Sequence, residues 1–505
     1  MASSLNQLRL ARRTSLWALL ASCLLLTVPV GATASSPEHA LVGISDPAAT
    51  GTTPGLLEAF APRWRAAGID VVSVSASWRE IAPGQDAKIQ PNGFNASDPN
   101  SSLYDWVNLD RVISVLRANK LEPLLTITGP GPLWASGDPE RGISRYRPSP
   151  AAFAEFAASV AVRYRDSVGR YIIWDEPNDP SRLTPQSYCA KKACSPRSPE
   201  IYRNLFNAGE SAIRAIDEDA DIYAGALAAR GSDPKLNDDP IRPVPWLRAF
   251  GCIDRNGSAD RTSSACRSFQ APVINGLAFH PDQRGQVPTK RLRSTFEVGI
   301  SDTRRLTTVL DAVQASGGLV NGSDVGAPVD LFYSQWGYQT NPPDVYSGVS
   351  LRSQNRWLQE GAKVAYGQPR VKLLSQYLWR DEPVFDAGQG VDAYAGGQSG
   401  LYAFDGTAKP AAGSFPNPFV ASSPAGSNSA HLWGQVRPGG AHSVTIQRRV
   451  GARAYRDVTV VQTDTQGYFK LQLPLATKAR FRYGWVTSSA SSRRHYSDAI
   501  SLSPR

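Results

Sequence analysis

Short apolar runs alternate with longer amphipathic stretches from residue 40 to residue 412. Apolar runs of about four to eight residues are typical of buried strands, and an apolar stripe with helical spacing is typical of a helix packed on a sheet. The predicted strands are 40–45, 69–76, 123–128, 171–174, 221–226, 274–279, 328–333 and 371–378. The predicted helices between them are 55–67, 109–119, 150–168, 199–217, 243–250, 302–315 and 351–366.

Eight predicted strands joined by helical crossovers indicate an α/β fold, a (β/α)8 or TIM barrel over residues 35–412. A doubly wound open sheet is the alternative with the same alternation. The phosphate-binding turns of such sheets are missing, because neither GxGxxG nor GxxxxGK[ST] follows any predicted strand. The sequence therefore argues against dinucleotide-dependent and nucleoside-triphosphate enzymes, and we expect neither a cofactor nor a metal.

The pattern changes after residue 412. Residues 413–430 are rich in Pro, Ser, Gly and Asn, which predicts a linker. Beyond it, short runs alternate apolar and polar residues with the period of a strand. These runs predict a small all-β sandwich over residues 431–505, with strands at 443–447, 457–462, 468–473 and 479–486.

The first 34 residues have the three parts of a secretory signal peptide. Arginines occur at 9–13, the stretch 16–30 is mostly apolar, and Ala-Thr-Ala at 32–34 is a small-x-small cleavage site. A membrane anchor is the alternative, but the apolar stretch is shorter than the roughly 20 residues that span a bilayer. We therefore predict a secreted, extracellular protein.

Cysteine usage agrees with export. Cys23 leaves with the signal peptide, and Cys189, Cys194, Cys252 and Cys266 remain. An even number in an exported chain suggests two disulfides, for which three pairings exist. We expect the nearest-neighbour pairing, Cys189–Cys194 and Cys252–Cys266. A zinc site is the alternative, although the chain has no CxxC pair and only five histidines.

Net charge separates the two predicted domains. Residues 431–505 hold 12 Lys and Arg against 3 Asp and Glu, a net charge of +9. The first 34 residues add +3 to the chain total of +10, which leaves −2 for residues 35–430. A basic domain favours anionic partners such as cell-wall polymers, and export makes nucleic acid an unsuitable partner. The alternative is a solvated basic surface that maintains solubility. We expect a monomer.

In a TIM barrel the catalytic groups lie at the C-terminal ends of the strands. The sequence around these predicted ends is rich in tryptophan and carboxylates. Aromatic faces stack on sugar rings, and carboxylates act on glycosidic bonds as acid, base or nucleophile. The candidate substrate contacts are Trp78, Trp134, Asp175, His280, Asp282, Trp336, Tyr338 and Trp379.

The fourth predicted strand ends in WDEPN, residues 174–178. This run resembles the Trp-Asn-Glu-Pro-Asn motif of the retaining glycoside hydrolases of clan A, especially families 5 and 39. The resemblance covers roughly residues 40–412. It implies a polysaccharide or oligosaccharide substrate and Glu176 as the catalytic acid/base. The seventh predicted strand ends in SQWG, residues 334–337, and the resemblance places Gln335 at the position of the nucleophilic glutamate.

The chain departs from this family pattern at the residues that matter for the chemistry. Gln335 replaces the nucleophile, Asp175 replaces the motif asparagine, and the arginine that contacts the nucleophile is missing near Ser73. A retaining mechanism needs two carboxyl groups about 5 Å apart, one of them ionised. Without a carboxylate at 335 to repel it, Glu176 should titrate closer to an ordinary glutamate and be a weaker acid at neutral pH.

Three interpretations follow from the sequence. The first is a working glycosidase with a changed mechanism, in which Asp282, Asp175, Asp381 or Glu382 holds a water or acts as base. The second is a catalytically inactive glycan-binding protein that keeps the cleft. The third is a cell-wall adhesion protein in which the basic domain matters most. A Ser-His-Asp hydrolase is disfavoured because the chain has no GxSxG.

Overall fold

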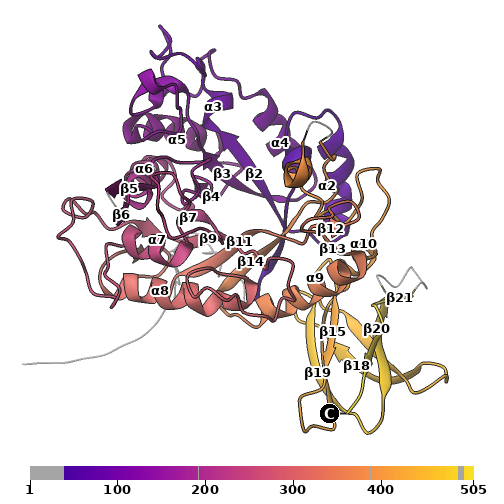
Figure 1. Ribbon diagram of the computed structural model, residues 1–505. Coiled ribbons are helices and arrows are strands. Elements are labelled where there is room, and N and C mark those ends of the chain that lie inside the picture. The colour runs from indigo at the N-terminus through magenta and orange to yellow at the C-terminus, as the bar shows by residue number, and fades with distance from the viewer. Residues whose placement is uncertain (1–38, 191–192, 386–387, 487–493, 505) are drawn as a thin grey trace, which may run out of the picture. The chain divides into compact units, whose positions relative to one another are not determined.

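The computed structural model describes residues 39–190, 193–385, 388–486 and 494–504 (Figure 1). The signal peptide predicted at 1–34 lies outside the described residues. Among the helices that are described, none is long and apolar enough to cross a membrane. The same residues contain no group of three or more His, Cys, Asp or Glu side chains that could hold a metal ion.

Eight parallel strands close into a barrel, which confirms the predicted TIM barrel (Figure 1). The closure joins the first strand to the last, since Leu41 pairs with Leu373 and Ser45 with Tyr377. All eight predicted strands are present, most with bounds shifted by one to three residues. In chain order they are β1 (Leu41–Ser45), β2 (Val71–Ser77), β3 (Glu122–Thr128), β4 (Arg170–Ile173), β7 (Asp221–Ala228), β9 (Gly276–His280), β11 (Asp330–Trp336) and β14 (Val371–Tyr377).

Helices follow the strands and cover the barrel (Figure 1). Local sequence explains where two of them begin: the side chains of Ser149 and Ser350 accept hydrogen bonds from the backbone N–H groups of Ala152 and Ser353. The longer helices are α2 (Leu56–Ala66), α4 (Val107–Ala118), α5 (Pro150–Tyr164), α6 (Ser198–Arg214), α7 (Pro243–Phe250), α8 (Thr303–Ala315) and α9 (Leu351–Tyr366). The short ones are α1 (Pro47–Thr50), α3 (Trp78–Ile81) and α10 (Pro410–Ser414).

The barrel interior has an apolar floor and a polar mouth. Tyr223 and Phe332 stack across the floor with ring centroids 4.0 Å apart, in a cluster with Val71, Leu124, Ile172, Ala278 and Leu373. Side chains two residues further along a strand point to the same face. On β2 these are serines, beginning with Ser73, so the mouth keeps open space above a filled core.

Two antiparallel sheets follow the barrel, as predicted for the C-terminal domain. The first is β15 (Phe419–Ser422), β16 (Ser429–Gln435) and β19 (Tyr468–Pro474). The second is β18 (Arg456–Gln462), β17 (Ser443–Arg449), β20 (Ala479–Val486), β21 (Arg494–Tyr496) and β22 (Ile500–Leu502). Phe419, Ile446, Phe481 and Tyr483 belong to one buried core that joins the two sheets.

The segment 413–430, which the sequence predicts to be a linker, contains a strand. β15 lies inside it and pairs with β16, which itself begins at Ser429. The side chain of Phe419 is 1% exposed and packs into the sandwich core. The sandwich therefore begins before residue 431, with a strand surrounded by turn-forming residues.

Two disulfides are formed with the predicted nearest-neighbour pairing. Cys189 and Cys194 join the hairpin β5 (Ser187–Ala190) and β6 (Ala193–Pro196). Cys252 and Cys266 close the loop that follows α7. The remaining short strands are paired outside the barrel: β8 (Val273–Ile274) with β10 (Val320–Asn321), and β12 (Thr340–Asn341) with β13 (Val349–Ser350).

Candidate active site

The chain bends sharply where β4 ends, and the bend presents two adjacent carboxylates. Trp174 and Glu176 have φ angles of 72° and 43°, and the Glu176 N–H donates to the carbonyl of Ala226 at 2.7 Å. In a regular strand Asp175 and Glu176 point to opposite faces. The left-handed backbone on both sides of Asp175 lets both carboxylates face the same neighbour, His280.

His280, at the end of β9, lies between these two carboxylates. Its Nδ1 is 2.9 Å from Glu176 Oε1, and its Nε2 is 4.0 Å from Asp175 Oδ1. Asp175 also lies 3.5 Å from the guanidinium of Arg182. The arrangement is an imidazole with a carboxylate at each ring nitrogen, and the direct hydrogen bond goes to Glu176.

These contacts set the protonation states. Burial acts to raise the pKa of Glu176, but the hydrogen bond and charge of His280 outweigh it and lower that pKa below its ordinary value. Burial acts to lower the pKa of His280, and Glu176 and Asp175 together raise it. Burial raises the pKa of Asp175. Glu176 is therefore ionised at neutral pH and is a poor proton donor, and the cause is His280, which the sequence argument did not consider.

Glu176 and Gln335 line the same cavity at the barrel mouth. This cavity has a volume of about 320 Å³, and its other lining residues include Arg230, His280, Asp282 and Tyr377. Gln335 lies in an irregular part of β11: Tyr333 pairs with Leu374 and Trp336 with Gln376, so β11 holds one extra residue there. The bulge is where the chain presents Gln335 to the cavity.

A second cavity of about 620 Å³ adjoins the first. The two share Arg230, Asp282, Gly337 and Tyr377 as lining residues. Tyr338 lines the second cavity and donates a hydrogen bond from its hydroxyl to the carbonyl of Gln286 at 2.9 Å. The two cavities are therefore adjacent, and we call them together the mouth cleft.

Ser73 occupies the position opposite the end of β11. Its hydroxyl donates to the carbonyl of Ser334, the residue before Gln335, at 3.3 Å. The resemblance places an arginine in this region that would contact the nucleophile, and the chain has a serine. Arg230 and Arg284 are cations that line the cleft instead, and they pair with Asp282 and Glu297.

The structure places Trp78 and Trp134 away from the cleft. Trp78 is 1% exposed and stacks on Phe156, with a ring-centroid distance of 5.9 Å. The Trp134 indole N–H donates to the carbonyl of Pro83 at 2.9 Å, and its ring contacts that of Trp78 edge-on. Neither residue lines the mouth cleft, so the prediction that they contact substrate is not supported by their position.

Trp336 and Trp379 are also buried against helices. The Trp336 ring packs on Gly361 of α9, where a Cβ atom would lie 2.0 Å from it. Trp336 therefore borders the cleft without offering it an open ring face. Trp379 packs on Tyr402 and under the guanidinium of Arg63. Burial in the shell between strands and helices explains both positions, because large aromatic rings fill that layer.

Four other carboxylates near strand ends have different environments. Asp381 is buried in an ion pair with Lys409 at 2.7 Å. Asp282 pairs with Arg230. Burial raises the pKa of Glu382, and the charge of Asp46 raises it further. The charges of Glu382, Asp46, Glu176 and Asp175 act on Tyr377, whose pKa is raised mainly by burial. Glu382 and Asp46 therefore act electrostatically on a residue of the mouth cleft, and neither of them lines it.

The sequence analysis does not select Arg230 or Tyr377 as site residues. Arg230 follows the fifth barrel strand, β7. The end of β7 carries no carboxylate or tryptophan, which are the residue types used to select the candidates. Tyr377 is the last residue of β14, and its sequence context does not differ from that of other aromatic residues in strands. The signal available for both is position alone: each lies at the C-terminal end of a barrel strand, or within two residues of it.

The sequence matches no protein-family model and no curated protein. Several solved structures are similar in fold. A glucosidase from Croceicoccus marinus has a TM-score of 0.48 and 13% identity, over 87% of this chain and 93% of that one. A family 5 glycoside hydrolase from Bacteroides vulgatus has a TM-score of 0.45 and 12% identity, over 87% and 89%. A family 1 β-glucosidase from Thermotoga maritima has a TM-score of 0.42 and 15% identity, over 73% and 93%.

Proposed function

We propose that this is a secreted carbohydrate-active protein of the glycoside hydrolase type, which receives a polysaccharide or oligosaccharide in the mouth cleft and hydrolyses O-glycosidic bonds. The observation that carries the proposal is the cavity shared by Glu176 and Gln335, with His280 hydrogen-bonded to Glu176. A cleft of two adjacent cavities lined by carboxylates, amide, hydroxyl and guanidinium groups suits several linked sugar rings. The two disulfides fit a protein that works outside the cell.

The residues favour a single displacement over a retaining double displacement. Gln335 carries no charge and cannot form a glycosyl ester. Glu176 is ionised beside His280, which suits a general base that takes a proton from water. In an inverting mechanism such a base activates a water on one face of the sugar, while a protonated carboxyl group on the other side donates to the leaving oxygen.

Glu382 is the residue that we propose as this acid. Its pKa is raised, by burial first and by Asp46 second, so it keeps its proton to higher pH than an ordinary glutamate. Its charge acts on Tyr377, which lines the cleft. Burial also raises the pKa of Asp381, but Lys409 occupies its carboxyl group at 2.7 Å, and Arg230 occupies that of Asp282, so neither is free to reach a leaving oxygen.

The proposal is tested by reducing-sugar release from plant, fungal and bacterial polysaccharides. Glu176→Gln and Glu382→Gln should each abolish release, whereas the matched substitution Glu155→Gln on the exposed face of α5 should leave it unchanged. Proton NMR of the first product should show inversion at the anomeric carbon. Retention, or full activity in Glu382→Gln, would remove the assigned acid.

Glycan binding without hydrolysis is the second candidate, and the neutral Gln335 at the nucleophile position favours it. In that case no polysaccharide is cleaved, and a glycan array still detects binding. Glu176→Gln should then change binding only modestly, since no proton transfer is lost. Release of sugar by the native protein that disappears in Glu176→Gln would exclude this candidate. A role in cell-wall adhesion depends on the basic domain and is tested separately below.

A further inference from the structure

A cavity of about 430 Å³ lies outside the barrel, between α7 and α8 and beside the loop closed by Cys252–Cys266. It shares no lining residue with the two cavities of the mouth cleft. Five arginines line it, and we call it the arginine groove. They are Arg248 on α7, Arg255 in the disulfide loop, Arg291 in the segment before α8, and Arg304 and Arg305 on α8.

The positive charge in this groove is mostly uncompensated. Asp302 is the one acidic residue among those that line it, and it lies 3.1 Å from Arg305. Among the described residues, no hydrogen-bond or ion-pair partner is found for the guanidinium groups of Arg248, Arg255, Arg291 and Arg304. Like charges that converge without counter-charges repel one another, and an anion in the groove offsets that repulsion. Neutral donors are also present, on Asn256, Thr295 and Thr308.

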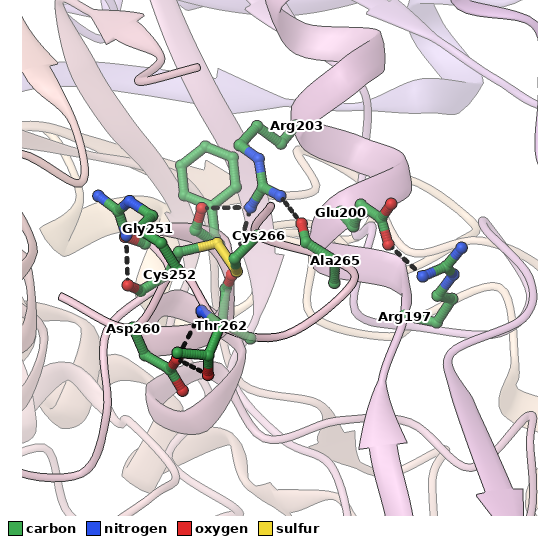
Figure 2. The surroundings of a disulfide bond; sticks show 12 residues. Arg197, Glu200, Arg203, Gly251, Cys252, Asp260, Thr262, Ala265 and Cys266 are labelled. Carbon is green, nitrogen blue, oxygen red and sulfur yellow. Dashed lines mark hydrogen bonds and ion pairs between the residues drawn. A yellow bond between two sulfur atoms is a disulfide. The ribbon is translucent and has the colours of Figure 1, made fainter. Parts of the chain in front are cut away.

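The loop that carries Arg255 is held in place by covalent and polar contacts (Figure 2). Cys252 and Cys266 close it, and Arg203 donates to the carbonyls of Phe250 at 2.8 Å and Ala265 at 2.5 Å. The backbone inside the loop is fixed as well: the Asp254 side chain accepts from the N–H groups of Asn256 at 2.8 Å and Ser258 at 2.9 Å. The groove wall is therefore ordered before any ligand arrives.

The second wall is one face of α8, from Arg304 to Ala312. Arg304, Thr308 and Ala312 follow one another at intervals of four residues and all face the groove. The helix is 13 residues long, so the partial positive charge of its N-terminus adds to the field of the arginines. Arginine binds tetrahedral oxyanions through two parallel N–H donors, which makes guanidinium clusters suited to phosphate and sulfate groups.

We propose that the arginine groove is a second carbohydrate-binding site, which recognises sulfate or phosphate ester groups on an acidic glycan. The site is distinct from the mouth cleft and does not depend on whether that cleft is catalytic. That the ligand is a glycan rests on the function proposed for the mouth cleft. It carries ester anions because uncharged sugars bring no charge to the four guanidinium groups that have no hydrogen-bond or ion-pair partner among the described residues, and tetrahedral sulfate and phosphate groups match the paired N–H donors of arginine.

The test uses the full chain and isothermal titration calorimetry at low and physiological salt. The probes are one disaccharide in three forms: unmodified, sulfated and phosphorylated. The groove variant is Arg248→Ala/Arg304→Ala. Its control is Arg165→Ala/Arg352→Ala, which removes the same charge from exposed positions outside the groove. Arg248→Lys/Arg304→Lys keeps the positive charge and removes the planar guanidinium group with its paired N–H donors.

The native protein and the control should bind at least one ester, and the groove variant should bind it about tenfold or more weakly, because two charge-assisted contacts are lost. The lysine variant should fall between them, and a comparison of the sulfated and phosphorylated probes identifies the ester. Three results would overturn the proposal: equal weakening in the control, equal binding of the unmodified disaccharide, or no saturable binding of either ester. Calorimetry measures binding to the arginine groove directly, so the result is independent of whether the mouth cleft releases sugar.

Discussion

At the scale of single residues, one hydrogen bond defines the chemistry of the mouth cleft. Glu176 Oε1 and His280 Nδ1 are 2.9 Å apart, and Asp175 lies at the other ring nitrogen. This environment stabilises the charged forms of Glu176 and His280. A catalytic acid that must hold a proton at neutral pH needs the opposite environment, with nothing that favours its charged form. The environment of Glu176 therefore favours its ionised form, which the proposed general base requires.

The Glu176–His280 ion pair should give stability a defined pH dependence. The raised pKa of His280 makes its contribution complete below the ordinary histidine value of 6.5, and the contribution is lost as pH rises through the folded pKa. The lowered pKa of Glu176 makes its contribution complete above the ordinary glutamate value of 4.5, and the contribution is lost as pH falls through the folded pKa.

His280→Asn should therefore destabilise the protein most between pH 4.5 and 6.5, by about 1 to 3 kcal/mol, the range for a hydrogen bond to a charged group. Urea unfolding of both proteins from pH 4 to pH 9 measures the difference. The difference should shrink toward pH 9 as His280 loses its charge. A difference that does not change with pH would mean that the two side chains interact without charge.

Gln335 also leads to a residue-scale prediction. The native protein should form no covalent glycosyl intermediate, because an amide cannot attack the anomeric carbon. Gln335→Glu should not convert the protein to a retaining mechanism, since Ser73 offers the new carboxylate no positive partner. Mechanism-based fluorosugar labelling followed by mass spectrometry checks both proteins. A stable adduct on any carboxylate of the native protein would reveal a replacement nucleophile and overturn the single-displacement assignment.

At the scale of elements, the bend after β4 depends on close packing beneath it. The Trp174 ring lies against Gly129 at the end of β3, where a Cβ atom would lie 2.0 Å from the ring. Trp174 is fully buried, and its left-handed φ begins the bend that presents Glu176. The glycine that follows β3 therefore allows the backbone bend after β4, and through it the position of Glu176.

Gly129→Ala should cost about 1 to 3 kcal/mol of stability, as overpacking of a filled core does, and should displace Trp174. Any mouth-cleft activity or glycan binding should fall with it, because Glu176 lies two residues beyond Trp174. Gly169→Ala is the matched control: it precedes β4, and no atom lies within 4 Å of the place that its added methyl group would take. Denaturant unfolding measures both. Equal stability of the two variants would show that β3 does not support the bend.

At the scale of the whole molecule, charge is divided between the barrel and the sandwich. Residues 431–505 carry +9 and residues 35–430 carry −2. The sandwich also has apolar contacts with the barrel, since Trp433 and Tyr468 are buried in one cluster with Ala362 of α9. Deletion of the sandwich would expose this cluster, so its charge is better tested by substitution than by truncation.

We expect the basic sandwich to bind anionic cell-wall polymers. Replacement of the exposed Arg453, Lys470 and Lys478 by Gln should weaken sedimentation with anionic wall material, and added salt should weaken it in the native protein. Lys120→Gln/Arg165→Gln/Arg352→Gln, which removes the same three charges from exposed positions on the barrel, is the control. If the triple variant sediments as well as the native protein does, the charge serves only as a solvated surface. An equal loss in the control would point to the net charge of the chain alone.

Sequence periodicity was sufficient to predict the barrel because local sequence determines its strands and helices. A buried strand needs an apolar run and a covering helix needs an apolar stripe, so all eight strands and seven helices were predictable. The nearest-neighbour disulfides were predictable for a similar reason, since short loops bring their ends together. β15 was missed because Phe419–Ser422 is short and lies among Pro, Ser and Gly, which predict a loop. It forms a strand because it pairs with β16, and its own sequence does not predict that pairing.

The site was decided by the tertiary structure. Sequence placed Glu176, Gln335 and His280 at strand ends, and these three do meet in one cavity. The sequence did not show whether a tryptophan at a strand end faces the mouth cleft or a helix. A shift of one residue along a strand reverses the direction of the side chain. The bend that brings Asp175 and Glu176 to His280, and the convergence of arginines from α7, α8 and a disulfide loop, join residues far apart in the chain. Such groupings depend on how elements pack, and local sequence does not encode them.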